Sequence, residues 1–225
     1  MKKQLTLLLF VFTFAPIADL FSFHFQPAYE IEPPILNLNT INQDYNVTEG
    51  VLSVSGYVLD AEGNPLENVE VCLNADLIEY PRCRETDEDG FYFFSNVTAD
   101  VDYELSAYSD APHIENVSTL DYVIIARHLL GHQKMESYLH LIAADTNADN
   151  KVSIRDLSDL RKVILGAYAK FPTNDSYRFI DATYTFPDED NPWPTEENNP
   201  YVIKFNPTTD TTHNFIGIKI GHVSF

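Results

Sequence analysis

The sequence has few basic residues and few cysteines. It contains 14 Lys and Arg against 34 Asp and Glu, which gives a formal net charge of -20. Phosphate contacts need clustered Lys and Arg, so this composition argues against a nucleic-acid partner and favours divalent cations. Only two cysteines are present and no Cys-x-x-Cys motif occurs, so we expect no zinc site. The sequence also lacks a Gly-x-Ser-x-Gly motif, a phosphate-binding loop and a Rossmann signature, and we expect no enzymatic activity.

Long apolar runs are also scarce, and the one clear example lies at the N-terminus. Two lysines precede an apolar stretch from Leu5 to Ala15, and a second small residue follows at Ala18. This layout is typical of a secretory signal peptide, which we place at 1–18. A membrane anchor is the alternative, although the run is shorter than the about 20 residues that span a bilayer. We therefore expect a secreted, extracellular or cell-surface protein with no membrane span after signal removal.

The remaining chain has the composition of folded modules, since 44% of all residues are hydrophobic and 13% are aromatic. Residues 19–50 lack sustained periodicity and contain several prolines, and we interpret them as a linker or leading segment. Between residues 51 and 108, short runs of alternating apolar residues are separated by turn sequences at 60–65 and 86–90. This pattern predicts a small antiparallel β-sandwich.

The two cysteines, Cys72 and Cys83, fall on segments that we predict to be neighbouring strands of this sandwich. Export would make their oxidation feasible, so a cross-strand disulfide is the favoured interpretation. Two free thiols are the alternative.

The sandwich segment, through Val54-Ser-Gly-Tyr-Val58, the run 64–69 and the run 86–94, resembles the carboxypeptidase regulatory-like family of β-sandwich modules. Related sandwiches are similar to starch-binding domains, so the resemblance implies carbohydrate binding as an alternative function. A sugar platform in this sandwich would consist of the aromatic residues Tyr57, Phe91 and Phe93. The alternative is that these three are ordinary strand residues.

The stretch from Asp145 to Asp156 has the spacing of a twelve-residue EF-type calcium loop. Three carboxylates drawn to within about 4 Å of a common point would repel one another by about 4 kcal/mol per pair, which a bound cation offsets. A solvated acidic turn is the alternative. Asn150 stands at the usual loop Gly, and Asn adopts left-handed angles more readily than most residues. The predicted Ca²⁺ ligands, at loop positions 1, 3, 5, 7, 9 and 12, are Asp145, Asn147, Asp149, the carbonyl of Lys151, Ser153 and Asp156.

The calcium loop belongs to an internal repeat, because residues 116–131 align without gaps on residues 151–166, an offset of 35. In each copy an Asp, Asp121 or Asp156, falls in the first turn of a predicted helix, where the helix dipole favours a negative charge. Apolar residues follow at helical spacing, and Gly131 or Gly166 stands where a helix C-terminus favours a left-handed residue. The repeat therefore predicts two amphipathic helices that pack on each other.

These loop-helix units, the second of which contains Asp-Leu-x-x-Leu-Arg-Lys-x-Ile-Leu-Gly, resemble a type I dockerin over residues 110–172. The resemblance implies Ca²⁺ binding and a cohesin-like extracellular partner. In the first unit Pro112 and Ile114 replace the expected oxygen ligands, which leaves Asp110 and Asp121 as a candidate second metal site. Partner choice in such modules is carried by loop positions 10 and 11, which here are Thr119, Leu120, Ile154 and Arg155.

Residues 173–225 are rich in aromatics, Pro and Asn and contain two strand-like pieces, 201–205 and 215–223. We expect an irregular and partly β C-terminal lobe that packs on the dockerin-like module, an arrangement that resembles modular bacterial surface proteins.

The predicted fold class is α+β and multi-module: a small antiparallel β-sandwich, a dockerin-like loop-helix pair and this lobe. The predicted function is a secreted, non-catalytic, calcium-binding interaction module whose partner is an extracellular protein or a glycan. The alternative is a carbohydrate-binding accessory component of a polysaccharide-degrading system.

Overall fold

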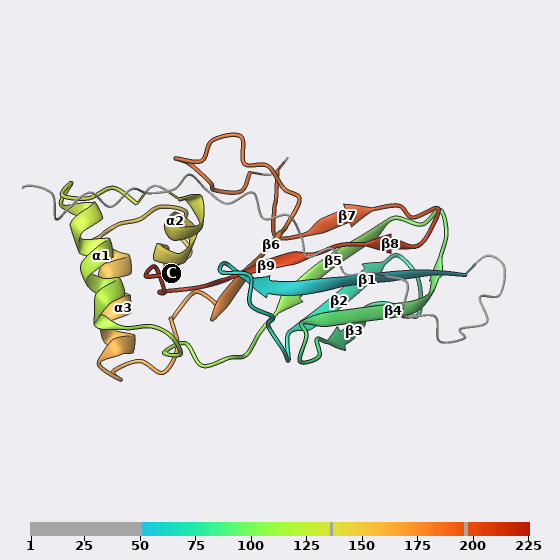
Figure 1. Ribbon diagram of the computed structural model, residues 1–225, viewed down its shortest axis with the longest axis horizontal. Helices are drawn as coiled ribbons and strands as arrows, with labels where there is room; N and C mark the ends of the chain where they lie inside the picture. The colour runs from blue at the N-terminus through green and yellow to red at the C-terminus, as the bar shows by residue number, and fades with distance from the viewer. Residues whose placement is uncertain (1–50, 136, 196–197) are drawn as a thin grey trace, which may run out of the picture. The chain divides into compact units, whose positions relative to one another are not determined.

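The part of the chain that the structure describes is built mainly from β-strands, and three short helices lie between its fifth and sixth strands (Figure 1). A computed structural model describes residues 51–135, 137–195 and 198–225, all of which belong to one compact unit, Val47–Phe225. The predicted signal peptide, 1–18, and leading segment, 19–50, lie outside the described residues. No helix in the described part of the chain combines the length and the apolar character needed to cross a bilayer.

The first sheet combines two strands of the sandwich segment with three strands from the C-terminal lobe. Its order is β4, β1, β9, β6, with β8 also paired to β1. Strands β1 and β4 run antiparallel, whereas β8 and β9 run parallel to β1. A parallel pair requires a crossover connection, and the helical segment lies within it. The strands are β1 (Val51–Asp60), β4 (Phe91–Thr98), β6 (Tyr177–Asp181), β8 (Thr211–Thr212) and β9 (Phe215–Lys219).

The second sheet is antiparallel and has the order β3, β2, β5, β7. Cys72 on β2 and Cys83 on β3 are directly opposite each other in the register and form a disulfide. All strand pairs within 51–108 are antiparallel among the described residues, while the C-terminal lobe adds β7 to this sheet. The strands are β2 (Glu70–Ala75), β3 (Arg82–Glu85), β5 (Tyr103–Tyr108) and β7 (Ile203–Phe205).

Alternation along the strands places one face of each sheet in the sandwich core. On β1, for example, Val54 and Val58 are fully buried, and on β4 Phe94 is fully buried. Two C-terminal residues, Phe179 on β6 and Phe215 on β9, belong to the same core. The sandwich core therefore includes side chains from the C-terminal lobe. The sequence predicts instead that this lobe packs on the dockerin-like module, residues 110–172.

The helical segment contains α1 (Thr119–Leu129), α2 (Tyr138–Ala144) and α3 (Ile154–Ile164). Ser118 and Ser153 cap α1 and α3 with the same reciprocal capping box, in which the third residue of the helix is Asp. Gly131 and Gly166 follow these helices with φ of 71° and 69°, as the repeat predicts. Helix α2 is additional to the two helices that the repeat predicts.

A second core lies between the three helices and the outer faces of β6 and β9. Because successive side chains on a strand point to opposite faces, Phe179 enters the sandwich core while Ile180 enters the helical core. The segment after β9 also enters this core, and the backbone N–H of Gly221 donates to the carbonyl of Ala143 at 2.8 Å. Buried members of the helical core include Ile125, Leu141, Ile142, Leu160, Val163, Phe171, Ile180, Ile218, Ile220 and Val223.

Candidate metal centre

The predicted calcium loop connects α2 to α3. Asp145 is the C-cap of α2, Ser153 is the N-cap of α3, and Asp156 lies in the first turn of α3. Ala148 and Asn150 adopt left-handed backbone angles, with φ of 60° and 61°. The φ of Asn150 is the conformation that the sequence predicts for the residue at the usual loop Gly.

This loop gathers the three carboxylates of Asp145, Asp149 and Asp156. Each offers an oxygen atom, and the three oxygens lie within 4.8 Å of one another. Asp145 and Asp156 are both 0% exposed. Burial raises the pKa of the Asp145 carboxyl, an effect that the nearby Arg178 opposes, and burial likewise raises the pKa of the Asp156 carboxyl. Two buried acids beside a third are therefore unfavourable as anions without a positive charge.

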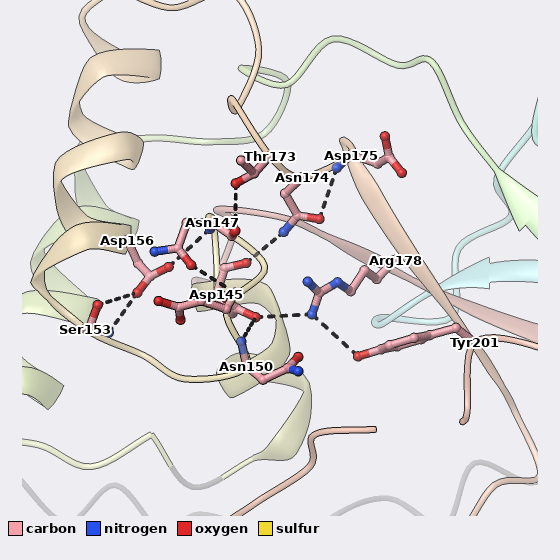
Figure 2. A network of polar contacts seen from close by, with 11 residues as sticks. Asp145, Asn147, Asn150, Ser153, Asp156, Thr173, Asn174, Asp175, Arg178 and Tyr201 are labelled. Atoms are coloured by element: carbon pink, nitrogen blue, oxygen red, sulfur yellow. Dashed lines mark hydrogen bonds and ion pairs between the residues drawn. The ribbon is translucent and has the colours of Figure 1, made fainter. Parts of the chain in front are cut away.

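Backbone N–H groups hold the two buried carboxylates in place (Figure 2). The N–H groups of Asp149 and Asn150 each donate to Asp145 at 3.1 Å, to Oδ1 and Oδ2 respectively. The N–H groups of Asn147 and Ser153 donate to Asp156 at 3.2 Å and 2.8 Å. By contrast, the buried Oδ1 of Asp149 has no hydrogen-bond partner among the described residues. An orphaned carboxylate oxygen beside two buried acids fits a hard, oxygen-binding cation.

The other predicted ligands lie in the same loop with different roles. The side-chain oxygen of Asn147 accepts from the N–H of Asp149 at 2.9 Å. The hydroxyl of Ser153 donates to Asp156 at 3.0 Å and accepts from the N–H of Arg155 at 3.2 Å, so it caps α3. The side chain of Lys151 is 62% exposed and pairs with Asp149 at 3.6 Å. The loop thus presents amide and hydroxyl oxygens beside the carboxylate cluster.

Residues from the C-terminal lobe form hydrogen bonds and an ion pair with this loop, and Figure 2 shows them. Thr173 donates to the carbonyl of Asn147 at 2.6 Å, and Asn174 donates to the carbonyl of Asp145 at 2.8 Å. Arg178 on β6 brings Nη1 to 3.3 Å from Oδ2 of Asp145 and to 3.5 Å from the hydroxyl of Tyr201. These residues carry no motif and lie 26 to 33 positions from their loop partners, so the sequence alone does not predict their contacts with the loop.

The first repeat has a different arrangement around Asp121, which is 0% exposed. Asp121 Oδ2 accepts from the N–H and hydroxyl of Ser118, at 2.7 Å and 2.8 Å. Asp121 Oδ1 accepts from the N–H of Val223 at 2.7 Å and lies 3.3 Å from Nδ1 of His222. Burial acts to raise the pKa of this carboxyl, but the donors of His222, Val223 and Ser118 together hold it well below its usual range.

Asp110, the other member of the candidate second metal site, is exposed and pairs with Lys170 at 2.9 Å. Neither Asp110 nor Asp121 belongs to a cluster of three or more metal-binding side chains in the described part of the chain. The first repeat therefore shows no carboxylate cluster like that of the second repeat among the described residues. The C-terminal residues 222–223 instead contact Oδ1 of Asp121, whereas the equivalent Asp156 lies in the three-carboxylate cluster of the second repeat.

The four predicted partner-binding residues lie in the first turns of α1 and α3, and all four are exposed. Leu120 is 56% exposed and Ile154 is 77% exposed. A groove of about 900 Å³ runs between the two helices. Ile154 and Arg155 line this groove, whereas Thr119 and Leu120 do not. The lining residues are Tyr122, Ala126, Leu129, Leu130, Lys151, Ser153, Ile154, Arg155 and Leu157.

The sandwich contains two further features that bear on function. Glu70, Cys72 and Cys83 lie within 4.8 Å of one another, but both sulfurs are held in the disulfide and are not thiolate ligands. The rings of Tyr57 and Phe91 are 5.2 Å apart and inclined at 51°, and both residues are half-buried. These two rings are therefore tilted relative to each other rather than coplanar.

Comparison with known proteins gives no family for this chain. No protein-family model matches it, and none of the curated proteins does. Solved structures with partial similarity include the major pilin subunit BcpA of Bacillus cereus (17% identity, TM-score 0.25) and a C-terminal fragment of the pilus adhesin SpaC from Lactobacillus rhamnosus GG (13%, 0.23). A 9R-lipoxygenase from Cyanothece PCC8801 (17%, 0.19) is also similar in part.

Each of these three matches covers 28% of this chain. The matches cover 20% of the pilin, 27% of the adhesin fragment and 12% of the lipoxygenase. The chain therefore spans about a quarter or less of the length of these proteins. At such TM-scores the likeness carries no conclusion about function.

Proposed function

We propose that this protein is a secreted, non-catalytic docking module whose dockerin-like helical segment is stabilised by one calcium ion. The observation that carries the proposal is the convergence of Asp145, Asp149 and Asp156, with oxygens within 4.8 Å of one another and two of the three side chains fully buried. A bound calcium ion would supply two positive charges to this cluster. The residues that would hold it are the three acids, with Asn147, Ser153 and the carbonyl of Lys151 from the same loop.

Calcium suits this loop better than magnesium or zinc. The side-chain groups of the proposed ligand set are oxygens of carboxylate, amide and hydroxyl type, which are ligands for hard cations. Magnesium requires nearly ideal octahedral geometry and retains several waters, whereas calcium tolerates irregular sets of six to eight oxygens. A twelve-residue loop with ligands of three chemical types favours the more tolerant ion.

The exposed face of α1 and α3 supports a protein partner. Leu130, the C-cap of α1, is 70% exposed and Ile154, on α3, is 77% exposed; both line the groove, and exposed apolar surface of this kind marks docking sites. Lys151 and Arg155 line the same groove, although the protein as a whole carries a formal net charge of -20. We therefore propose an extracellular, cohesin-like partner that presents apolar side chains flanked by carboxylates.

Calcium titration by calorimetry tests the metal part of the proposal. The wild type is expected to bind one ion, and Asp145→Ala is expected to lose that binding. Asp110→Ala is the matched control, because Asp110 is an exposed acid that pairs with Lys170 outside the cluster. A wild type that binds no calcium would refute the proposal, and two ions per chain would contradict the single site.

Binding to a panel of immobilised type I cohesins tests the docking part. Binding is expected in calcium, not in chelator, and Ile154→Glu is expected to abolish it. Ile78→Glu is the matched control, because Ile78 is a fully exposed apolar residue between β2 and β3, outside the helical segment. Equal loss of binding in both variants would count against the helical face.

A further inference from the structure

Arg178, on strand β6 of the first sheet, places a positive charge beside the candidate metal loop. It lies on β6, 33 residues after Asp145, and its Nη1 is 3.3 Å from Oδ2 of that residue. The Arg178 side chain is only 13% exposed and that of Asp145 is 0% exposed. In the view of Figure 2 the guanidinium approaches Asp145 from the side away from Asp156. This ion pair is therefore shielded from solvent and weakly screened by salt.

The contacts of Arg178 hold its guanidinium in position. Its backbone pairs with Ile218 of β9, and its guanidinium lies 5.5 Å from the ring centroid of Tyr201, whose hydroxyl is at 3.5 Å from Nη1. Lys151, which pairs with Asp149 of the cluster, differs because its side chain is 62% exposed and can turn into solvent. An Arg side chain also keeps its charge at any pH at which the protein folds. The positive charge beside Asp145 is therefore permanent.

We infer that Arg178 is a built-in counter-charge, which stabilises the loop when no ion is bound and weakens calcium binding. The inference rests on the proposed calcium site. Without the ion, the guanidinium compensates part of the negative charge that Asp145 carries into the protein interior. With the ion, the same fixed charge repels the cation and competes for the Asp145 carboxylate. Arg178 is thus a positioning residue that sets calcium affinity from outside the loop.

Arg178→Gln removes the positive charge and leaves a shorter side chain that still ends in an N–H donor. We expect the calcium dissociation constant of Arg178→Gln to fall at least about tenfold, since the like charge is lost from a buried site. The melting temperature in chelator is expected to fall, while that of the calcium-loaded protein stays close to wild type. Calorimetric titration and thermal unfolding measure these quantities.

Two variants serve as controls for charge. Arg178→Lys keeps the positive charge and is expected to bind calcium within about threefold of wild type. Arg161→Gln removes an exposed positive charge from α3, and its calcium affinity is expected to match wild type. The rate of calcium release into excess chelator adds a readout that starts from the folded, loaded protein, and Arg178→Gln is expected to release the ion more slowly. This readout applies even if Arg178→Gln does not fold without calcium.

The outcomes distinguish this inference from the proposed function. If the wild type binds one calcium ion but Arg178→Gln binds it no more tightly and releases it no more slowly, the counter-charge role is wrong and the calcium site stands. If the wild type binds no calcium, the proposed function fails, and the inference fails with it.

Discussion

Asp121 and Asp156 occupy the same position in the two copies of the repeat, yet their carboxylates meet different partners. Both are fully buried, and each accepts from the N–H and hydroxyl of the Ser three residues earlier. The remaining oxygen of Asp156 accepts from the N–H of Asn147, and its carboxylate lies in a cluster with two other acids. The remaining oxygen of Asp121 accepts from the N–H of Val223 and lies 3.3 Å from Nδ1 of His222. One repeat thus gathers three carboxylates, whereas the Asp of the other repeat is contacted by the protein's own C-terminal segment.

Exchanging each Asp for Asn should separate these two roles. Asp121→Asn removes a buried anion that accepts three hydrogen bonds, and we expect it to lower the free energy of unfolding by about 3 kcal/mol without changing calcium affinity more than about threefold. Asp156→Asn is the matched variant, and we expect it to weaken calcium binding at least about tenfold. Urea unfolding in chelator and calcium calorimetry measure the two effects. Equal loss of calcium affinity in both variants would show that Asp121 also serves an ion.

At this scale the sequence predicts local geometry and misses tertiary contacts. The spacing of Asp145, Asp149 and Asp156 within one short loop is enough to predict that their carboxylates converge. The contacts of Arg178 and His222 depend on the path of β6 and β9 over the helices, and no spacing rule relates residues 33 or 101 positions apart. Arg178 is conspicuous in the sequence only as one of 14 basic residues in an acidic chain.

Strand β9 is the element that brings the two cores together. Phe215 enters the sandwich core, whereas Ile218 and the following Ile220 enter the helical core. The alternation of apolar residues in 215–223 predicts a strand with two faces. It does not predict the partner, because β9 pairs in parallel with β1, more than 150 residues earlier, across the whole helical segment. Parallel pairing leaves no turn sequence by which to recognise it.

Lys219, the last residue of β9, gives this element a pH-dependent stability. Its side chain is nearly buried, with Nζ 2.6 Å from both the Pro112 carbonyl and the Ser176 hydroxyl and 4.6 Å from the ring centroid of Tyr177. Burial lowers the pKa of Lys219 to about 8. The folded protein therefore releases this proton at a lower pH than the unfolded chain, whose lysine titrates near 10.5.

Below pH 8 the amine is charged in the folded protein, and its burial lowers the free energy of unfolding by the full amount. This destabilisation is removed as the pH rises to 10.5. Over this window the free energy of unfolding of the wild type should rise, relative to that of Lys219→Met, by up to roughly 3 kcal/mol. Urea unfolding of both proteins at several pH values between 7.5 and 10.5 measures the difference. Parallel pH profiles would mean that Lys219 titrates in the folded state as it does in the unfolded chain.

At the scale of the whole molecule, strands of the C-terminal lobe connect the sandwich core to the helical core. The C-terminal lobe supplies β8 and β9 to the first sheet and β7 to the second, so strands β1 and β5 lose neighbours if residues 173–225 are removed. The side chains of Arg178, Asn174 and Thr173, from the same lobe, contact the candidate metal loop. We therefore expect residues 51–225 to unfold as one cooperative unit, rather than as the three consecutive modules that the composition of the sequence suggests.

Calcium should accordingly stabilise strands that lie outside the loop. At a free calcium concentration of about 100 times the dissociation constant, one ion adds about 2.7 kcal/mol, which corresponds to a rise in melting temperature of roughly 5–10 °C for a unit of this size. Calorimetry should show a single transition that shifts with calcium, and amides of β2 and β5 should exchange more slowly with solvent deuterium. Asp145→Ala should abolish both effects. If only the helical segment gained protection while β2 and β5 exchanged at unchanged rates, β9 would not transmit the stability of the loop to the sandwich, and the two cores would unfold independently.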